Sequence, residues 1–335
     1  MERERIGFTT TIPVEIILAA GDVPIDLNNI FVASADAGDF IRRAEMDGYP
    51  RNLCSWIKGI YGSVMMSAPV DRIIIVTEGD CSNTISMLET FQVMAGAPPI
   101  ITFNFPHNRD ASRLEVEMRR LSSALGTTLE AAEEKRRALL PLRDKLRRLD
   151  DLTWKTGQVT GGENHLYLVS SSDFGGDPEV FERRLDAFLE EAEKRPSGRP
   201  KIRLAFAGVP PIFSNLYQYL SDHGAEIILN EMQRQFSMPY DYESLVSQYL
   251  LYTYPYDVFS RLKDLAVEIK RRRVHGLIHY VQAFCHRGIE DIVLRHELDI
   301  PILTLEGDAP GQIDARTRLR LETFLELIQS KVQKG

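Results

Sequence analysis

Three cysteines are the residues of this 335-residue chain whose type and spacing point most directly to chemistry. Cys54 lies in a turn that opens a predicted helix, whereas Cys81 and Cys285 each follow an apolar, strand-like run. Their separations of 27 residues (54 to 81) and 204 residues (81 to 285) match no compact zinc-finger spacing. Because a disulfide is not expected in a reducing cytosol, the open alternatives are buried apolar cysteines, metal ligands and a catalytic thiol.

One hypothesis uses all three thiols: they meet in one pocket and bind an iron–sulfur cluster. A [4Fe–4S] cluster normally takes four thiolates, so three would leave one iron open to water or substrate. Such a site would act as a Lewis acid as well as an electron carrier. Zinc bound by the three cysteines and one histidine, either His279 or His286, is an alternative.

The segments that carry Cys81 and Cys285 share a layout. Each cysteine lies 11 residues after a valine that precedes a strand-like run. A Pro-Ile-Ile/Leu-Thr run then follows, 18 residues after Cys81 and 16 after Cys285. Residues just past the carboxyl ends of parallel strands line the crevice where α/β proteins bind ligands. If the two domains face each other, both cysteines lie in one interdomain pocket.

Polar residues at the same strand edges are candidates for proton transfer and for tuning a cluster. Glu78, His286 and Glu306 are the candidate general acids and bases. A structural alternative exists for each: Glu78 could cap the next helix and His286 could simply be exposed. Ser55 and Asn83 could donate hydrogen bonds to cluster sulfurs and so tune its potential.

The elements that would position these residues alternate between strands and helices. Predicted strands cover 29–34, 72–77, 100–103, 201–207, 226–229, 276–281 and 301–305. Predicted helices cover 14–20, 37–46, the Cys54 turn to about 66, 84–94, 212–223, 258–273, 287–297 and about 314–332. Thr9–Thr11 before Pro13 predict a hydroxyl-capped helix start, with anion binding as the alternative. The alternation indicates an α/β protein with parallel, doubly wound sheets.

The length suits two domains of ordinary size. We expect residues 1–109 to form an N-terminal helix plus the first α/β domain. Residues 110–196 form a mostly helical connecting block, and residues 197–335 form the second α/β domain. The run Pro196–Pro200 is the clearest linker, and the active site is expected in the interdomain cleft.

Composition excludes several classes of function. The formal net charge of −8 argues against a nucleic-acid partner. No apolar run approaches the ~20 residues needed to span a bilayer, and no signal-peptide pattern opens the chain, so we expect a cytoplasmic protein without a membrane partner. The glycine-rich patterns of dinucleotide-binding proteins, P-loop proteins and serine hydrolases are absent.

Several motifs together resemble one family. They are Thr9–Gly21 (TTTIPVEIILAAG), Pro24–Leu27 (PIDL), Arg51–Cys54 (RNLC), Phe284–Cys285 and Leu305–Asp308 (LEGD). The chain resembles the D-component of 2-hydroxyacyl-CoA dehydratases, a family that includes the related benzoyl-CoA reductase subunits. The resemblance covers nearly the whole chain, and its most specific parts are the N-terminal motif and the first cysteine motif.

This resemblance implies two Rossmann-like or flavodoxin-like domains with a helical insertion. It also implies a [4Fe–4S] cluster whose ligands fall on Cys54, Cys81 and Cys285. Family members usually act as a heterodimer of two homologous subunits, and a homodimer is the alternative arrangement. A separate iron–sulfur ATPase activator supplies one low-potential electron, and a ketyl radical on the acyl-CoA thioester then expels the neighbouring hydroxyl group.

The expected function is therefore the iron–sulfur subunit of a lyase that acts on an acyl-CoA or other small molecule. Two alternatives from other classes stay open. One is an ATP-coupled low-potential reductase of another small molecule. The other is a non-catalytic protein that carries a cluster.

Overall fold

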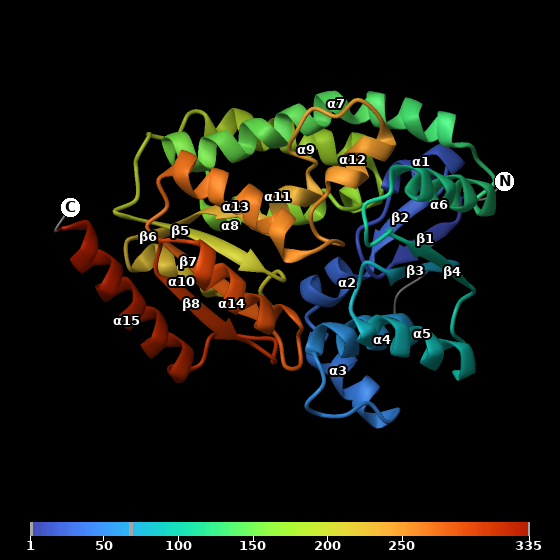
Figure 1. Ribbon diagram of the computed structural model, residues 1–335, viewed down its shortest axis with the longest axis horizontal. Coiled ribbons are helices and arrows are strands. Elements are labelled where there is room, and N and C mark those ends of the chain that lie inside the picture. The colour runs from blue at the N-terminus through green and yellow to red at the C-terminus, as the bar shows by residue number, and fades with distance from the viewer. Residues whose placement is uncertain (1–2, 67–69, 334–335) are drawn as a thin grey trace. The chain divides into compact units, whose positions relative to one another are not determined.

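The computed structural model describes residues 3–66 and 70–333 (Figure 1). The chain divides into two compact units. Unit 1 consists of Met1–Asp144, Ser170–Arg183 and Met238–Asp257, and unit 2 consists of Lys145–Val169, Arg184–Ser237 and Val258–Gly335. The stretch 110–196, expected as a connecting block, is mostly helical and is shared between the two units.

Each unit contains one four-stranded parallel sheet. In unit 1 the strands are β1 (Arg5–Phe8), β2 (Val23–Asp26), β3 (Arg72–Glu78) and β4 (Ile100–Asn104), in the order β2-β1-β3-β4. In unit 2 they are β5 (Ile202–Gly208), β6 (Ala225–Asn230), β7 (Gly276–Val281) and β8 (Ile302–Glu306), in the order β6-β5-β7-β8. The predicted class, α/β with two Rossmann-like parallel sheets, is confirmed.

The two sheets repeat one topology. In both, the first and third strands are central and the second and fourth are at the edges. Strand β3 therefore corresponds to β7, and β4 corresponds to β8. This correspondence confirms the repeat that the spacing around Cys81 and Cys285 predicted.

Helices connect the strands, as parallel pairing requires. The first group is α1 (Val14–Ala20), α2 (Leu27–Ala33), α3 (Ala37–Met46), α4 (Ser55–Met66), α5 (Ser82–Val93), α6 (Ala111–Ala124) and α7 (Leu129–Asp151). A π-helical turn, η1 (Leu152–Thr156), α8 (Gly161–Ser170), a 3-10 turn, η2 (Phe174–Gly176), and α9 (Pro178–Ala192) follow. The remaining helices are α10 (Leu216–Asp222), α11 (Glu231–Phe236), α12 (Leu245–Leu251), α13 (Val258–Arg272), α14 (Arg287–Glu297) and α15 (Ala315–Val332).

The prediction of a strand over 29–34 is wrong, because this segment belongs to α2. Asp26 is the last residue of β2, and its side chain accepts the backbone N–H of Asn28. This hydrogen bond caps α2, so the helix begins directly after the strand. Leu27 and Phe31, four residues apart, then bury one face of α2. The strands that the prediction missed, β1 and β2, are only four residues long.

The prediction that threonine hydroxyls cap α1 is also wrong. The residue before α1 is Pro13, and no side chain caps this helix end. Thr9, Thr10 and Thr11 are instead buried in the loop between β1 and α1. They lie at the carboxyl edge of the unit 1 sheet.

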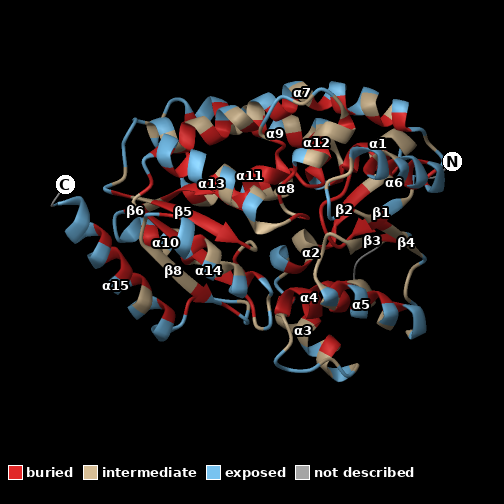
Figure 2. Ribbon diagram, in the orientation of Figure 1, coloured by how far each residue is buried: buried red, intermediate tan, exposed pale blue. Residues whose placement is uncertain are grey.

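The core of unit 1 lies between β3 and the helices α4 and α5. Ile73 and Ile75 on β3 pack with Ile60 and Met87, and all four are buried. Each such side chain contributes about 1.5–3 kcal/mol through burial. Unit 2 has a matching apolar cluster formed by β7, α13 and α14. Figure 2 shows long runs of buried residues in α4 of unit 1 and in β5 of unit 2. No helix among the described residues is long and apolar enough to cross a membrane.

Candidate functional site

Cys81 lies just past β3, at the residue that precedes the first turn of α5. The Thr84 hydroxyl is 3.7 Å from the Cys81 sulfur, and the backbone amides of Thr84 and Asn83 face the same sulfur. Burial, and then the charge of Asp80, outweigh these donors and raise the pKa of the Cys81 thiol. Burial thus favours the neutral thiol form of Cys81.

The Cys81 loop is fastened by Asp80. One carboxylate oxygen of Asp80 accepts the backbone N–H of Cys81 at 2.7 Å, and the other accepts the hydroxyl of Thr10. The preceding Gly79 has a φ of 106°, which favours glycine. A Cβ at Gly79 would lie 2.8 Å from Phe105 and 2.9 Å from Pro255. The loop is therefore closely enclosed.

Glu78, the last residue of β3, has structural partners. Its Oε1 accepts the backbone N–H of His107 at 2.8 Å, and its Oε2 lies 3.4 Å from the guanidinium of Arg113. The first contact holds the loop between β4 and α6, and the second reaches the first turn of α6. The role of Glu78 as a general acid or base stays a prediction.

Cys54 directly precedes α4, where Ser55 is fully buried. The buried Lys58 fixes this turn, because its ammonium donates to the carbonyl of Arg51 and to Glu45, both at 2.8 Å. Cys54 and Cys81 are both half-buried and pack against the same apolar cluster of unit 1. Both predicted ligands therefore contact the same core cluster of unit 1. Asn83 is half-buried in the first turn of α5.

Cys285 occupies the matching place in unit 2, between β7 and α14. The amide of the buried Gln282 donates to the carbonyl of Gly307 and, at 3.1 Å, to the hydroxyl of Tyr280. The backbone N–H of Ala283 donates to Asp308 at 2.6 Å. The Cys285 loop is therefore tied to the loop after β8.

The proton-transfer candidates of unit 2 lie beside this loop. His286 has a side chain that is 53% exposed, and its Nε2 is 3.8 Å from an oxygen of Glu290. Burial of part of the ring, and then the charge of Arg287, lower the pKa of His286. Glu306 is exposed at the end of β8, where it pairs in register with Val281 of β7.

His279, an alternative zinc ligand, is placed differently. It is fully buried within β7, and its Nδ1 lies 2.9 Å from an oxygen of Asp291 on α14. The Thr304 hydroxyl donates to the same oxygen at 2.7 Å. His279 thus belongs to a buried hydrogen-bonded set between β7, β8 and α14.

A pair of carboxyl groups that sequence reasoning missed lies at the carboxyl end of β2. The Ser172 hydroxyl donates to Asp26 at 2.5 Å, and the Asp26 backbone N–H donates to Asp173 at 2.8 Å. Burial raises the pKa of both side chains, and burial together with the charge of Asp26 raises the pKa of Asp173 to about 7. The only sequence signal is Asp26 in the PIDL motif, because its partners lie almost 150 residues away in the chain.

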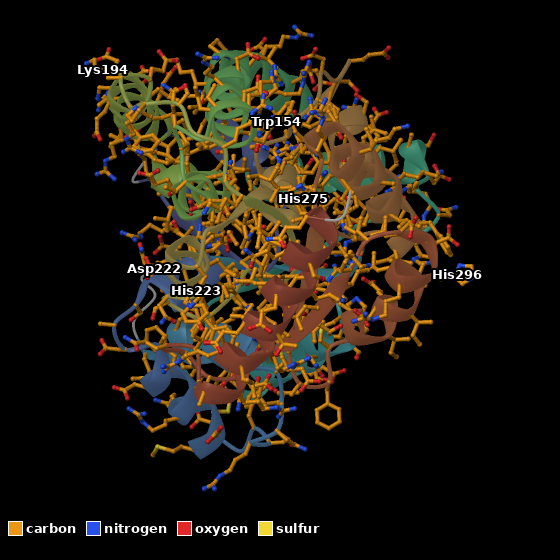
Figure 3. All side chains as sticks on the ribbon, turned by 90° about the vertical axis from the view of Figure 1, so that its left-hand side faces the viewer. Trp154, Lys194, Asp222, His223, His275 and His296 are labelled. Atoms are coloured by element: carbon orange, nitrogen blue, oxygen red, sulfur yellow. The ribbon has the colours of Figure 1, made fainter. Side chains whose placement is uncertain are left out.

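Unit 2 also has a cavity at the amino edge of its sheet, of ≈ 810 Å³. It is lined by the start of β5, the turn before β6 and the end of α15. Asp222 and His223, labelled in Figure 3, belong to its lining. Cys285 follows the opposite, carboxyl end of β7, so this cavity is not part of the candidate site.

Comparison with known proteins decides the family. Residues 9–328 match the family model described as "2-hydroxyglutaryl-CoA dehydratase, D-component". The chain belongs to this family. A relative in Escherichia coli (strain K12), "Putative dehydratase subunit YjiM", is 24% identical over 361 residues, which cover 96% of this chain and 90% of the relative.

Membership of the D-component family confirms the resemblance seen in the sequence motifs. It indicates that the chain has a dehydratase-like role in an enzyme of the lyase class. As a D-component, the chain is one subunit of a system with partner components.

The thiols of this D-component fit an iron–sulfur cluster in chemical type. Each cysteine lies outside any disulfide, is half-buried, and stands in a loop that leads into a helix. Soft sulfur donors at helix N-termini suit a cluster with thiolate ligands. Within residues 3–66 and 70–333, no group of three or more His, Cys, Asp or Glu is arranged to hold a metal ion. Because unit 1 holds Cys54 and Cys81 and unit 2 holds Cys285, the three-ligand set stays a prediction.

Proposed function

We propose that this chain is the iron–sulfur subunit of a 2-hydroxyacyl-CoA dehydratase-like enzyme. It catalyses a radical-based, reductive elimination of water after a one-electron activation. The observation that carries this proposal is the equivalent position of Cys81 and Cys285, each just past the third strand of sheets with the same strand order. Membership of the D-component family supports the choice of reaction.

The proposed ligands are Cys54, Cys81 and Cys285, which would draw the cluster's donors from both units. A [4Fe–4S] cluster held by these three cysteines would pass on one low-potential electron and would offer one iron with an open coordination position. In this proposal Ser55 and Asn83, in the first turns of α4 and α5, would donate hydrogen bonds to cluster sulfurs.

The surrounding residues hold the ligands and handle protons. Asp80 fixes the Cys81 loop, and Gln282 fixes the Cys285 loop through Gly307. Elimination of water needs an acid for the departing hydroxyl group and a base for the neighbouring C–H proton. Among the candidates, His286 and Glu306 are exposed at the sheet edge. Glu78 already binds His107 and Arg113, so we assign it mainly to positioning the loop after β4.

The proposed partners follow from the same reaction. The substrate is an acyl-CoA or a related small molecule, and the electron comes from a separate ATP-dependent iron–sulfur activator. The chain works with a homologous second subunit or as a homodimer. The D-component assignment supports the need for partner components.

Metal analysis under strict anaerobiosis tests the cluster. We expect about four irons per chain and a broad absorption near ~400 nm. Replacing any one of the three cysteines by alanine should abolish both signals. Ser82→Ala is the matched control, because Ser82 neighbours Cys81 but is exposed, and it should keep its iron. Stoichiometric zinc without iron would overturn the proposal.

A second experiment separates a dehydratase from a reductase of another molecule and from a cluster carrier. The reduced protein is titrated with 2-hydroxyacyl-CoA thioesters while the EPR signal of the cluster is recorded. A thioester-dependent change in the signal supports the dehydratase. A loaded cluster that no thioester affects would favour one of the other two functions.

A further inference from the structure

Hydrogen bonds link the buried carboxyl pair of unit 1 to the loop that carries Cys81. The pair consists of Asp26, the last residue of β2, and Asp173, in the turn before η2. Asp26 is 3% exposed and Asp173 is 6% exposed. The segment 170–183 is one of two parts of the chain that return to unit 1 between segments of unit 2, so this pair helps to hold it there.

Burial of both carboxyl groups favours one bound proton on the pair. Asp173 accepts the backbone N–H groups of Asp26 and Gly175, and Asp26 accepts the Ser172 hydroxyl. These donors are neutral, and two carboxylates cannot both stay charged in a buried site without a compensating cation. The pKa of Asp173, raised to about 7 by burial and by the charge of Asp26, agrees with one proton bound to the pair near neutral pH.

In the described part of the chain, the contacts observed for the nearby charged groups are with groups other than the pair. Glu15 on α1 and Arg143 on α7 bind each other at 2.6 Å, and Arg143 lies over the ring of Phe174. Arg5 is at the opposite end of β1, where its N–H binds Asp71, and α2 carries no charged residue. Asp177 caps α9.

Asn28 connects the pair to the threonine loop. Its side-chain amide donates to Asp26 at 2.7 Å and to the carbonyl of Thr9 at 2.9 Å. The next residue, Thr10, donates its hydroxyl to Asp80, which in turn accepts the Cys81 N–H. The carboxyl edges of β2, β1 and β3 are thus joined by one set of hydrogen bonds.

We propose that the Asp26–Asp173 pair carries one proton and that both residues act, through Asn28 and the threonine loop, as positioning residues for Cys81. The inference rests on the proposed function only in treating Cys81 as a ligand. When the proton leaves to solvent, the two carboxylates repel each other. The turn 171–176 then loosens, and the Cys81 loop loosens with it.

Amide hydrogen exchange of the metal-free full-length chain at pH 6 and pH 8.5 tests this coupling. After correction for intrinsic exchange rates, protection of segments 171–176 and 79–83 should fall together at the higher pH, by about tenfold. Strand β7 in unit 2 serves as the internal reference. Unchanged protection in 79–83 would overturn the inference, whether or not 171–176 responds.

Three variants make the test specific. Asp173→Asn removes the proton carried by the pair, so neither segment should respond to pH. Asn28→Ala keeps both carboxyl groups but removes the side-chain hydrogen bonds to Asp26 and to Thr9, so 171–176 should still respond and 79–83 should not. Asp22→Asn is the control, because Asp22 is a buried carboxyl just before the opposite end of β2 and should behave as the wild type. If Asp173→Asn does not fold, the test rests on Asn28→Ala. A pH-dependent loss of protection in 79–83 in that variant would then overturn the inference.

A measurement on the loaded protein distinguishes this inference from the proposed function. The exchange experiment uses no metal, so failure of the cluster would leave its outcome unchanged. If the cluster binds, its midpoint potential should depend less on pH in Asn28→Ala than in the wild type. An equal pH dependence in both proteins would count against positioning through Asn28.

Discussion

The side chain of Asp80 accepts the backbone N–H of the next residue, Cys81, at 2.7 Å. This hydrogen bond holds the backbone at Cys81 in place. The second oxygen of Asp80 binds Thr10, which is 70 residues away in the chain. The orientation of the Cys81 side chain therefore depends on the loop after another strand.

Asp80→Ala should lower the iron content of the anaerobically loaded chain several-fold. The substitution removes the hydrogen bonds to Cys81 and Thr10 and should reduce the free energy of unfolding by about 1–3 kcal/mol. Iron analysis and urea denaturation measure the two effects. Asp71→Ala is the matched control, because Asp71 accepts one backbone N–H, from Arg5, just before the amino end of β3. If both variants lose iron equally, the loss reflects stability and not the Cys81 loop.

Gly79→Ala should be more damaging than its size suggests. The backbone at Gly79 has a φ of 106°, and a Cβ would approach Phe105 to 2.8 Å, so both strain and a clash result. We expect a loss of about 2–4 kcal/mol in unfolding free energy. Gly96 also has a positive φ, but a Cβ there would meet no other atom. Gly96→Ala should therefore lower the free energy of unfolding by only about 1 kcal/mol. Equal urea midpoints for the two variants would contradict this account.

Removal of iron should affect both units, because the proposed ligands come from both. Chelation under anaerobic conditions should reduce hydrogen-exchange protection around Cys54 and Cys81 in unit 1 and around Cys285 in unit 2. Binding of a ligand only to the folded state stabilises it, which is the source of the expected loss. Unchanged protection over 283–288 would exclude Cys285 as a ligand.

The carboxyl pair should make the protein less stable as the pH rises. The pKa of Asp173 is about 7 in the folded chain, and an exposed aspartate titrates near 3.9. Between these values the folded state holds a proton that the unfolded state has lost. This contribution is therefore fully present below pH ~4 and disappears as the pH rises through 7, at about 1.4 kcal/mol per pH unit at most. Urea denaturation at pH 5, 6 and 8 should show this decline in the wild type and a smaller one in Asp173→Asn.

Titration of His165 should have the opposite effect on stability and should destabilise the protein at acid pH. Burial lowers the pKa of this side chain in unit 2 to about 4, so the folded state excludes a proton that the unfolded state binds below pH 6.5. Stability is therefore lost as the pH falls from 6.5 toward 4. His165→Phe keeps the stacking on Tyr217, whose ring centroid is 5.0 Å away, and should flatten this acid-side decline.

Trp154 is a suitable reporter for the His165 experiment, because it lies in unit 2 and the other tryptophan, Trp56, lies in unit 1. With Trp56 replaced by phenylalanine, fluorescence-detected unfolding at pH 5 and pH 7 follows unit 2. The same pH slope in the wild type and in His165→Phe would show that other groups cause the acid-side loss.

Elements whose apolar pattern is local and repeated could be predicted from the sequence. The four fully buried residues Ile73–Val76 form a continuous apolar run, which is the mark of a central parallel strand, and β3 lies there. Helix α14 and strand β7 have the predicted bounds. The repeated spacing placed Cys81 and Cys285 after corresponding strands, because strand length, turn and helix start are all short-range features.

The short strands and the contacts between distant loops depend on how the whole chain folds and could not be predicted. Strand β1 has four residues and owes its central place to pairing with β2 and β3, which no local pattern encodes. Asp26 meets Asp173, and Thr10 meets Asp80, across separations of 147 and 70 residues. Such pairs form only where the carboxyl ends of neighbouring strands and their loops meet, so their energies depend on burial and distance in the folded chain. The residue types were visible in the sequence, but their protonation and partners were set by the fold.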